Sequence, residues 1–343
     1  MKKNISMALG RVFFFAFFLH VGSADADSGS LSGISGTSQG SSNWQSMEKT
    51  MGRPGVEQGD MLKITFPRTD LNVTVNGIPL EPGLALTTWF AFKPMPKGTI
   101  VMGDMVLLDE EVPKVLSELV KGGFEVSAIH NHLLNESPSM KHIHISGHGS
   151  RVNLAQSLKV LLSFTGTPFR PAGFEGQAPP SPFAPPSANA TPPGLLDWSK
   201  VQAILGPGKV NGRVLQYGFP RAEAITEKGM EIPPFMGTET SINLQKVGGL
   251  VIGEKGPLGL PVGSKTSKDV VAATGDFVLI SDEVKPVVDT LTQNHITVTA
   301  IHNHMLNESP RLFFLHFWAL GAPTEVAKGL KEALGKVDLA EMK

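Results

Sequence analysis

An eleven-residue polar segment occurs twice in this chain with almost no change. Residues 128–138 read Ala-Ile-His-Asn-His-Leu-Leu-Asn-Glu-Ser-Pro, and residues 300–310 repeat this order with one leucine-to-methionine change. The residues just before each segment, 103–127 and 275–299, share only 9 identities in 25. A duplication that keeps one polar segment while its surroundings diverge indicates a constraint on that segment. The chain is therefore expected to contain two similar repeats.

The duplication reaches well upstream of this segment. Phe66-Pro67-Arg68 matches residues 219–221 at an offset of 153, whereas the polar segment repeats at an offset of 172. The second copy thus carries 172 − 153 = 19 extra residues, which we place in a loop at 254–274. A chain of 343 residues is long enough for two domains. Composition divides it into a signal peptide (1–26), a Gly/Ser-rich leader (27–42), a first repeat domain (43–165), a Pro-rich linker (166–196), a second repeat domain (197–335) and a C-terminal tail (336–343).

Basic residues precede a short apolar run at the amino terminus. Two lysines and Arg11 are followed by the Phe-rich residues 12–19, and Ala24-Asp25-Ala26 supplies small residues for cleavage. This order is typical of a secretory signal peptide. A membrane anchor would need about 20 apolar residues, roughly twice the length of this run. We expect a secreted or periplasmic protein without a membrane span after cleavage.

Charge and cysteine content exclude several classes of protein. Cleavage after Ala26 leaves 30 − 3 = 27 basic and 31 − 1 = 30 acidic residues, a net charge of 27 − 30 = −3. A mildly acidic chain without Lys/Arg clusters argues against nucleic-acid binding. With no cysteine there is no disulfide, thiolate ligand or acylated cysteine. Any bound metal must be held by histidine, carboxylate or amide groups.

Hydrophobic periodicity places helices and strands in the same order in both copies. Helices are expected at 44–51, 112–120 and 154–162, and at 198–205, 284–291 and 326–334. Strand patterns cover 61–66, 71–75, 84–92, 106–108, 124–133 and 141–148, and 214–219, 241–244, 249–252 and 278–280. Each copy thus reads as several strands followed by β-α-β-β-α. This pattern predicts the α+β class, with two tandem homologous repeats that each have a mainly antiparallel sheet and helices on one face.

Eight of the ten histidines lie in or just after the two polar segments. Alternate side chains on a strand share a face, and a hairpin that pairs His130 with His144 would bring four imidazoles onto one patch. The set common to both copies is three histidines and a glutamate: His130, His132, Glu136 and His144, and His302, His304, Glu308 and His316. This set suits a divalent ion, zinc or another transition metal. We therefore predict a metal site in each repeat.

The two glutamates have a second possible role. Glu136 and Glu308 are candidate catalytic bases for metal-dependent hydrolysis. His142 and His148 could add ligands in the first copy only. In the alternative interpretation, Asn-Glu-Ser-Pro only specifies a turn and the histidines are half-buried strand residues that bond to the backbone.

A second polar element, Phe-Pro-Arg followed two residues later by a carboxylate, also occurs in both copies, at 66–70 and 219–223. A bend held by an arginine–carboxylate pair is favoured here over an anion-binding arginine. The tryptophans Trp44 and Trp198 are expected to anchor the opening helices in the core.

The repeated polar segment, together with Phe313-Phe314-Leu315-His316-Phe317-Trp318 and the helical residues 327–334, resembles the LppY/LpqO homologue family. The resemblance covers nearly all of residues 43–335. It implies an exported bacterial protein of unknown function. Its namesakes are lipoproteins, but this chain has no cysteine to carry a lipid.

Two classes of function follow from these observations. The first is an exported protein that binds a divalent metal, as a metal-binding protein or a metal-dependent hydrolase. The second is a non-enzymatic envelope binding module with structural or pH-sensing histidines. In either case the partner is an unknown small molecule or an envelope component.

Overall fold

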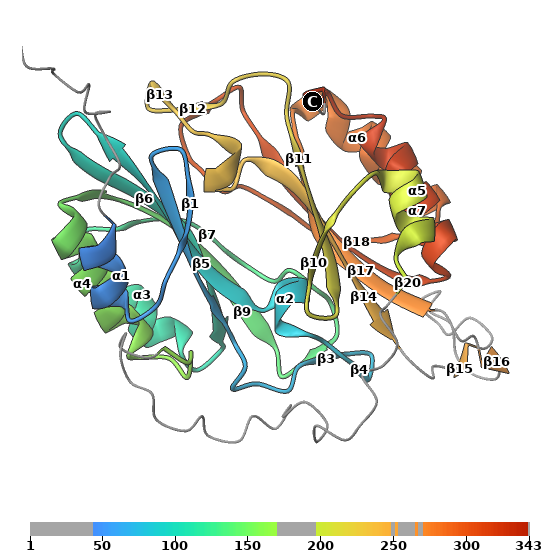
Figure 1. The fold of residues 1–343 in the computed structure, drawn as a ribbon, viewed down its shortest axis with the longest axis horizontal. Helices are drawn as coiled ribbons and strands as arrows, with labels where there is room; N and C mark the ends of the chain where they lie inside the picture. The colour runs from blue at the N-terminus through green and yellow to red at the C-terminus, as the bar shows by residue number, and fades with distance from the viewer. Residues whose placement is uncertain (1–43, 170–196, 248–250, 253–264, 267–269, 342–343) are drawn as a thin grey trace, which may run out of the picture. The chain divides into compact units, whose positions relative to one another are not determined.

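The computed structural model describes residues 44–169, 197–247, 251–252, 265–266 and 270–341 (Figure 1). The expected signal peptide and leader, most of the linker and most of the expected 254–274 loop lie outside these residues. None of the described helices combines the length and the apolar composition that a bilayer crossing requires.

The first repeat alternates strands with a few helices. In chain order its elements are α1 (Gln45–Met51), β1 (Val56–Gln58), β2 (Met61–Pro67), β3 (Thr74–Val75), β4 (Ile78–Pro79), α2 (Pro82–Ala85), β5 (Thr87–Met95), β6 (Gly98–Leu108), α3 (Val112–Lys121), β7 (Glu125–His130), β8 (Glu136–Ser137), β9 (Met140–Gly149) and α4 (Arg151–Leu162).

The second repeat follows the same order, with a 3-10 turn in place of α2 and an added hairpin. Its elements are α5 (Ser199–Leu205), β10 (Lys209–Asn211), β11 (Val214–Pro220), β12 (Thr226–Glu227), β13 (Met230–Glu231), η1 (Pro234–Met236), β14 (Glu239–Val247), β15 (Val251–Ile252), β16 (Lys265–Thr266), β17 (Val270–Leu279), α6 (Ser281–Gln293), β18 (Thr297–His302), β19 (Glu308–Ser309), β20 (Phe313–Gly321) and α7 (Pro323–Leu334).

Each repeat builds one six-stranded antiparallel sheet. The strand orders are β1-β2-β5-β6-β9-β7 and β10-β11-β14-β17-β20-β18. Helices α1, α3 and α4 lie against one sheet, and helices α5, α6 and α7 lie against the other (Figure 1). The predicted α+β fold, with two antiparallel repeats and helices on one face of each sheet, is confirmed.

Alternation along the strands explains which face each helix layer covers. On β2, Leu62, Ile64 and Phe66 are fully buried in the core under the helices. The residues between them, Lys63 and Thr65, therefore face the other side of the sheet. Trp44 and Trp198 are buried in the two helix-side cores, as the sequence predicts.

Two further apolar clusters join the repeats. Helix α2 of the first repeat contacts β14 and β17 of the second, and η1 of the second contacts β5 of the first. In one cluster Leu84 packs with Ala272 and Trp318; in the other Met236 packs with Met102. Each repeat thus covers part of the inner sheet face of its neighbour, and the described residues of both belong to one compact unit.

Two local expectations need adjustment. The predicted strand at 84–92 begins as helix α2, because Pro82 starts a helical turn that lasts to Ala85, and the strand begins only at Thr87. The extra residues of the second copy fall between β14 and β17, that is, between Val247 and Val270, whereas the equivalent strands β5 and β6 are joined by a two-residue turn.

The shared arginine has the structural role that the sequence favours. Arg68 is fully buried, and its guanidinium donates to Asp70 at 2.9 Å, to Glu111 at 2.8 Å and to the carbonyl of Val106 at 2.7 Å. Arg221 repeats this arrangement with Glu223, Glu283 and the carbonyl of Val278. Each arginine ties a strand end to the helix that follows the central strand.

Candidate metal centre

Seven histidines gather on the sheet faces that point away from the helices. On β9, Ile143 and Ile145 enter the helix-side core, so His142 and His144 point to the opposite face. On β20, Leu315 and Phe317 do the same and leave His316 on the inner face. The others come from the end of β7 or β18 or from the loops that follow: His130, His132, His302 and His304.

The hairpin register differs from the expected one by two residues. His130 lies opposite His142, and Ala128 lies opposite His144. A shift of two keeps every side chain on its face. The rings of His130 and His144 are still neighbours, with centroids 5.0 Å apart, and those of His302 and His316 are 4.7 Å apart.

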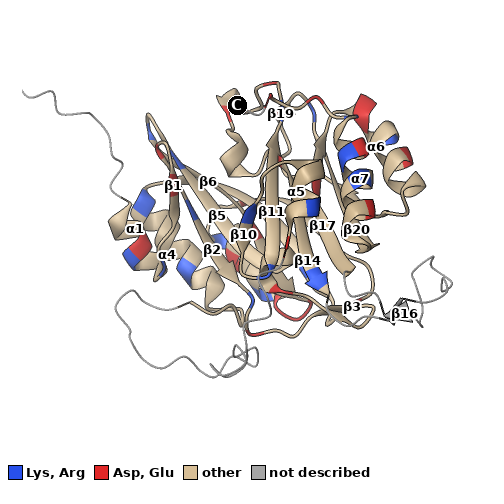
Figure 2. Ribbon diagram, turned by 45° about the vertical axis from the view of Figure 1, so that its right-hand side comes forward, with Lys and Arg blue, Asp and Glu red and all other residues tan. Residues whose placement is uncertain are grey.

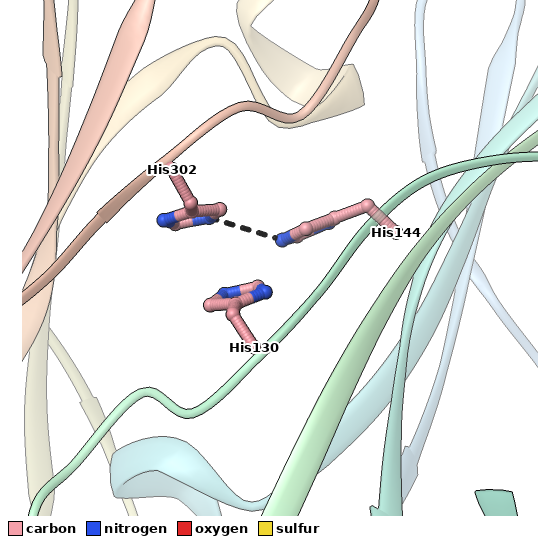
Figure 3. A group of neighbouring side chains, drawn as sticks. All are labelled: His130, His144 and His302. Carbon is pink, nitrogen blue, oxygen red and sulfur yellow. Dashed lines mark hydrogen bonds between the residues drawn. The ribbon is translucent and has the colours of Figure 1, made fainter.

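The closest histidine contacts cross between the repeats. The Nε2 atoms of His130 and His316 are 3.3 Å apart, and those of His302 and His144 are also 3.3 Å apart. Because 302 is 130 + 172 and 316 is 144 + 172, these two contacts are equivalent under the duplication. Figure 3 shows His302 and His144 with their ring nitrogens facing each other, and His130 beside both. The sequence placed the histidines in two separate sites, whereas the structure brings them into one shared cluster.

Reciprocal hydrogen bonds hold the two histidine loops against each other. Ser127 Oγ donates to the carbonyl of His304 at 2.5 Å, and Thr299 Oγ1 donates to the carbonyl of His132 at 2.6 Å. These pairs are again related by the offset of 172. The position of each loop is therefore fixed by the neighbouring repeat.

Two aspartates complete the cluster, and the sequence interpretation missed them. Asp104 on β6 lies opposite His144, and Asp276 on β17 lies opposite His316. Asp104 Oδ2 is 3.1 Å from His142 Nδ1, and Asp276 Oδ2 is 3.1 Å from His304 Nε2. The sequence did contain a sign of these aspartates. Gly103-Asp104 recurs as Gly275-Asp276, and each pair places a carboxylate inside an otherwise apolar strand.

The glycine of this Gly-Asp pair allows the strands to approach closely. A Cβ at Gly275 would lie 2.0 Å from the carbonyl oxygen of Ser241, so no larger residue fits there. The carbonyl of Gly275 also accepts a hydrogen bond from Nδ1 of His316 at 2.9 Å. That bond leaves Nε2 of His316 as the unprotonated nitrogen, which is the form that binds a metal.

The donor atoms converge closely enough for one ion to be shared. Four groups of three donors lie within 4.8 Å: His130/His144/His302, His130/His132/His316, Asp104/His132/His144 and Asp276/His302/His304. Two nitrogens on a tetrahedral zinc at ~2.1 Å lie ~3.4 Å apart. The two 3.3 Å contacts between repeats match this spacing.

Several of these atoms are buried without a hydrogen-bond partner. Among the described residues they include Nδ1 of His130, Nε2 of His132, Nδ1 of His302 and one oxygen each of Asp104 and Asp276. Buried polar atoms in folded proteins nearly always have a partner, including water or an ion. The residues therefore fit a bound cation.

Five of the imidazoles are held in their neutral form. Burial, and then repulsion from the other histidines, lowers the pKa of His130, His132, His144 and His302 below the usual 6.5. Burial also lowers the pKa of His316, although Asp276 opposes this shift. Neutral imidazole is the form that a metal ligand requires.

The predicted glutamates belong to none of the four groups. Glu308 is buried, accepts a hydrogen bond from the backbone N–H of Leu312 at 3.1 Å and pairs with Arg311 at 3.3 Å. Burial raises the pKa of Glu136 to about 7, although His142 and contacts with Asn131 and Leu133 oppose this shift. The carboxylates within the groups are those of Asp104 and Asp276.

The two extra histidines of the first copy differ in position. His142 is buried and stacks on His132, and Phe314 stacks on His304 at the equivalent place in the second copy. His148 is exposed near the far end of β9, opposite Ile100. Only His142 therefore reaches the cluster.

Cavities open on both sides of the histidines. The larger, of about 670 Å³, lies between the inner sheet faces, and its wall includes Asp104, Asp276, His144 and His316. The smaller, of about 500 Å³, is lined by His130 and Glu136 among others. Elsewhere, helices α1, α6 and α7 carry residues of both signs, and helix α4 carries only basic ones (Figure 2).

The fold and this cluster define a two-repeat α+β protein in which both repeats build one histidine–aspartate centre. The chain belongs to the family described as Domain of Unknown Function (DUF1259), whose model matches residues 45–163 and 263–336. No curated protein matches the chain. A trimeric bacterial microcompartment shell protein, PduB, aligns over 84% of this chain and 95% of its own, at 10% identity and a TM-score of 0.20. A TM-score this low does not establish a shared fold.

Proposed function

We propose that this protein binds a divalent transition metal, zinc or a similar ion, between its two repeats. The observation that carries the proposal is the convergence of buried histidine nitrogens and aspartate oxygens from both repeats, several of which have no hydrogen-bond partner among the described residues. Isolated polar atoms of this kind are costly to bury, and a cation would satisfy several of them at once. Of the predicted ligands, the six histidines stay in the proposal, and Asp104 and Asp276 take the ligand role that the sequence assigned to Glu136 and Glu308.

The test measures metal bound to protein purified without a histidine tag. Elemental analysis after dialysis, followed by competition titration with Zn²⁺, Mn²⁺, Ni²⁺ and Cu²⁺, should give saturable binding. Replacing His148, which lies outside the cluster, by Ala is the matched control and should leave binding unchanged. If wild type binds none of these ions, the histidines are structural and the envelope binding module is the better description.

A double-mutant cycle distinguishes a shared centre from one site per repeat. If His130 and His316 hold the same ion, His130→Ala, His316→Ala and the double variant should each lose that ion, so the effects are not additive. If each repeat has its own site, the two substitutions affect different ions and their effects add. Additive losses would favour the original expectation of separate sites.

Metal-dependent hydrolysis is a second candidate function, and the position of Glu136 favours it. Glu136 and His130 line the same cavity of about 500 Å³, and a base with a pKa near 7 is well matched to proton transfer at neutral pH. A divalent ion would supply Lewis-acid polarisation of a substrate. Glu136 would accept the proton of the attacking water, and Glu308 is the equivalent candidate in the second repeat.

The hydrolysis proposal is tested with chromogenic esters and phosphate esters. Glu136→Gln should lower the metal-dependent rate by about 100-fold or more if this carboxylate is the base. Glu308→Gln should have a smaller effect, because Leu312 and Arg311 already engage that carboxylate. Equal rates in wild type and Glu136→Gln would exclude the role.

We also propose that the protein is exported by a bacterium, as the resemblance to the LppY/LpqO homologues implies. The support is the basic, apolar and small-residue order of residues 1–26. Amino-terminal sequencing of protein recovered outside the cytoplasm should find a start near Asp27. An intact segment 1–26 on that protein would contradict cleavage.

A further inference from the structure

The larger cavity lies at the junction of the duplicated halves. Its wall contains matching positions of both repeats: Lys63 and Gln216, Thr87 and Glu239, Trp89 and Ser241, Asp104 and Asp276, and His144 and His316. The last two pairs, next to the histidine centre, are identical in the two repeats. The first three pairs, farther along the sheets, all differ. The inner end of the cavity, at the histidine centre, therefore has the same residues from both repeats. The outer wall, which is the part of the lining farther from that centre, has different residues from the two repeats.

Two cations on the outer wall have no acidic partner. Lys63 and Arg53 both line the cavity, and within the described part of the chain no carboxylate lies at ion-pair distance from either. The ammonium of Lys63 lies 4.9 Å from the ring centre of Trp89 and 4.6 Å from that of Phe235. These rings hold the amine in place and leave its strong hydrogen-bonding capacity unused.

A carboxylate also lines the cavity near Lys63. Burial lowers the pKa of Lys63, and Glu239, whose own pKa burial raises, opposes that shift without lying at ion-pair distance. Arg213, the remaining cation of the wall, lies 3.5 Å from Glu81. A ligand with one anionic group would be attracted to the ammonium of Lys63, and Glu239 would disfavour a second anionic group beside it.

We propose that this cleft binds a small organic anion, with its carboxylate or phosphate group at Lys63 and its other end at the histidine–aspartate centre. The cavity of about 670 Å³ has the size of ordinary small-molecule sites. A charged hydrogen bond from the Lys63 ammonium suits a carboxylate or a phosphate group. The inference deepens the proposed function, because the metal centre forms the inner end of the same cleft.

The experiment is a calorimetric titration of the full chain with inorganic phosphate, with succinate and with uncharged succinamide. Each titration is made with zinc-loaded and with chelator-treated protein, and bound zinc is measured on the same samples. Phosphate and succinate should bind saturably and succinamide should not. A preference between the two anions identifies the ligand group as phosphate or carboxylate.

Variants of the outer wall decide whether Lys63 is responsible. Lys63→Gln, which installs the residue of the second repeat, should weaken anion binding by about tenfold or more. Lys63→Arg keeps the charge and should restore most of it, and the exposed Lys97→Gln is the matched control. Unchanged binding in Lys63→Gln, or saturable binding of neither anion, would overturn the proposal.

The zinc measurement keeps the two proposals separate. Zinc binding without Lys63-dependent anion binding would refute the anion site alone. Anion binding that depends on Lys63 in protein without zinc affinity would refute the metal centre and leave the anion site standing.

Discussion

Acidification should unfold the metal-free protein, because its buried histidines cannot take up protons. Burial lowers the pKa of five of them in the folded state, whereas in the unfolded chain each has a pKa of about 6.5. A lowered folded pKa means that the unfolded state binds more protons below pH 6.5. Stability is therefore retained above this pH and lost as the pH falls below it.

The size of this effect follows from burial. At pH 5.5 a histidine that stays neutral in the folded state costs about 1.4 kcal/mol relative to neutral pH. His144, which is 3% exposed, is given this full value. His316, whose shift Asp276 opposes, and His130, His132 and His302, which keep some exposure, are given half. The total is about 4 kcal/mol, close to the whole stability of a marginally stable protein.

The assay is urea unfolding followed by circular dichroism in chelator, from pH 7.5 to 5.5. Glu136, whose raised pKa acts in the opposite sense, is replaced by Gln in every protein compared. Adding His130→Gln and His302→Gln should reduce the acid loss by about 1 kcal/mol or more. His295→Gln, at an exposed position outside the cluster, is the control. A free energy of unfolding that changes by less than about 1 kcal/mol over this range would refute the reasoning.

Three further predictions concern single positions. His142→Phe, which copies Phe314 of the second repeat, should pack well but weaken metal binding in a competition titration, because it removes a buried ring nitrogen beside Asp104. Arg68→Met should cost about 3–5 kcal/mol in urea unfolding, since it leaves Glu111 buried and unpaired, and adding Glu111→Gln should recover part of the loss. For Glu136, burial raises the folded pKa to about 7, so its stabilising contribution is complete below about pH 4.5 and is lost as the pH rises through 7. Glu136→Gln should therefore raise the melting temperature at pH 8 and have little effect at pH 4.5.

Local pattern was sufficient to predict most of the fold. The alternation along β2, β7, β9 and β11 and the apolar stripes of α3, α4, α6 and α7 identify strands and helices close to the observed bounds. The arginine–carboxylate bend was also predictable, since Arg68 and Asp70 are two residues apart and recur in the second copy. Helix α2 was missed because its four residues are too few to show a helical period.

The arrangement of the site was not predictable from local pattern. Spacing along a strand predicts that His130 and His132 share a face of the sheet. It does not predict which residues of the other repeat contact that face. The contact between His130 and His316 joins residues 186 positions apart, and it depends on how one sheet packs against the other. Glu136 was chosen as a ligand because it lies inside the repeated segment, whereas Asp104 lies in an adjacent strand and reaches the histidines only through strand pairing.

The shared centre explains why the polar segment changed so little after duplication. A site within one repeat would require only its own copy to stay intact, and the other copy could diverge. Here the ring of His130 meets His316, that of His302 meets His144, and each histidine loop receives a hydrogen bond from the other repeat. A change in either copy therefore disturbs contacts on both sides of the junction. The outer wall of the cleft does not take part in these matched contacts between the repeats. The equivalent positions Lys63 and Gln216 on that wall differ.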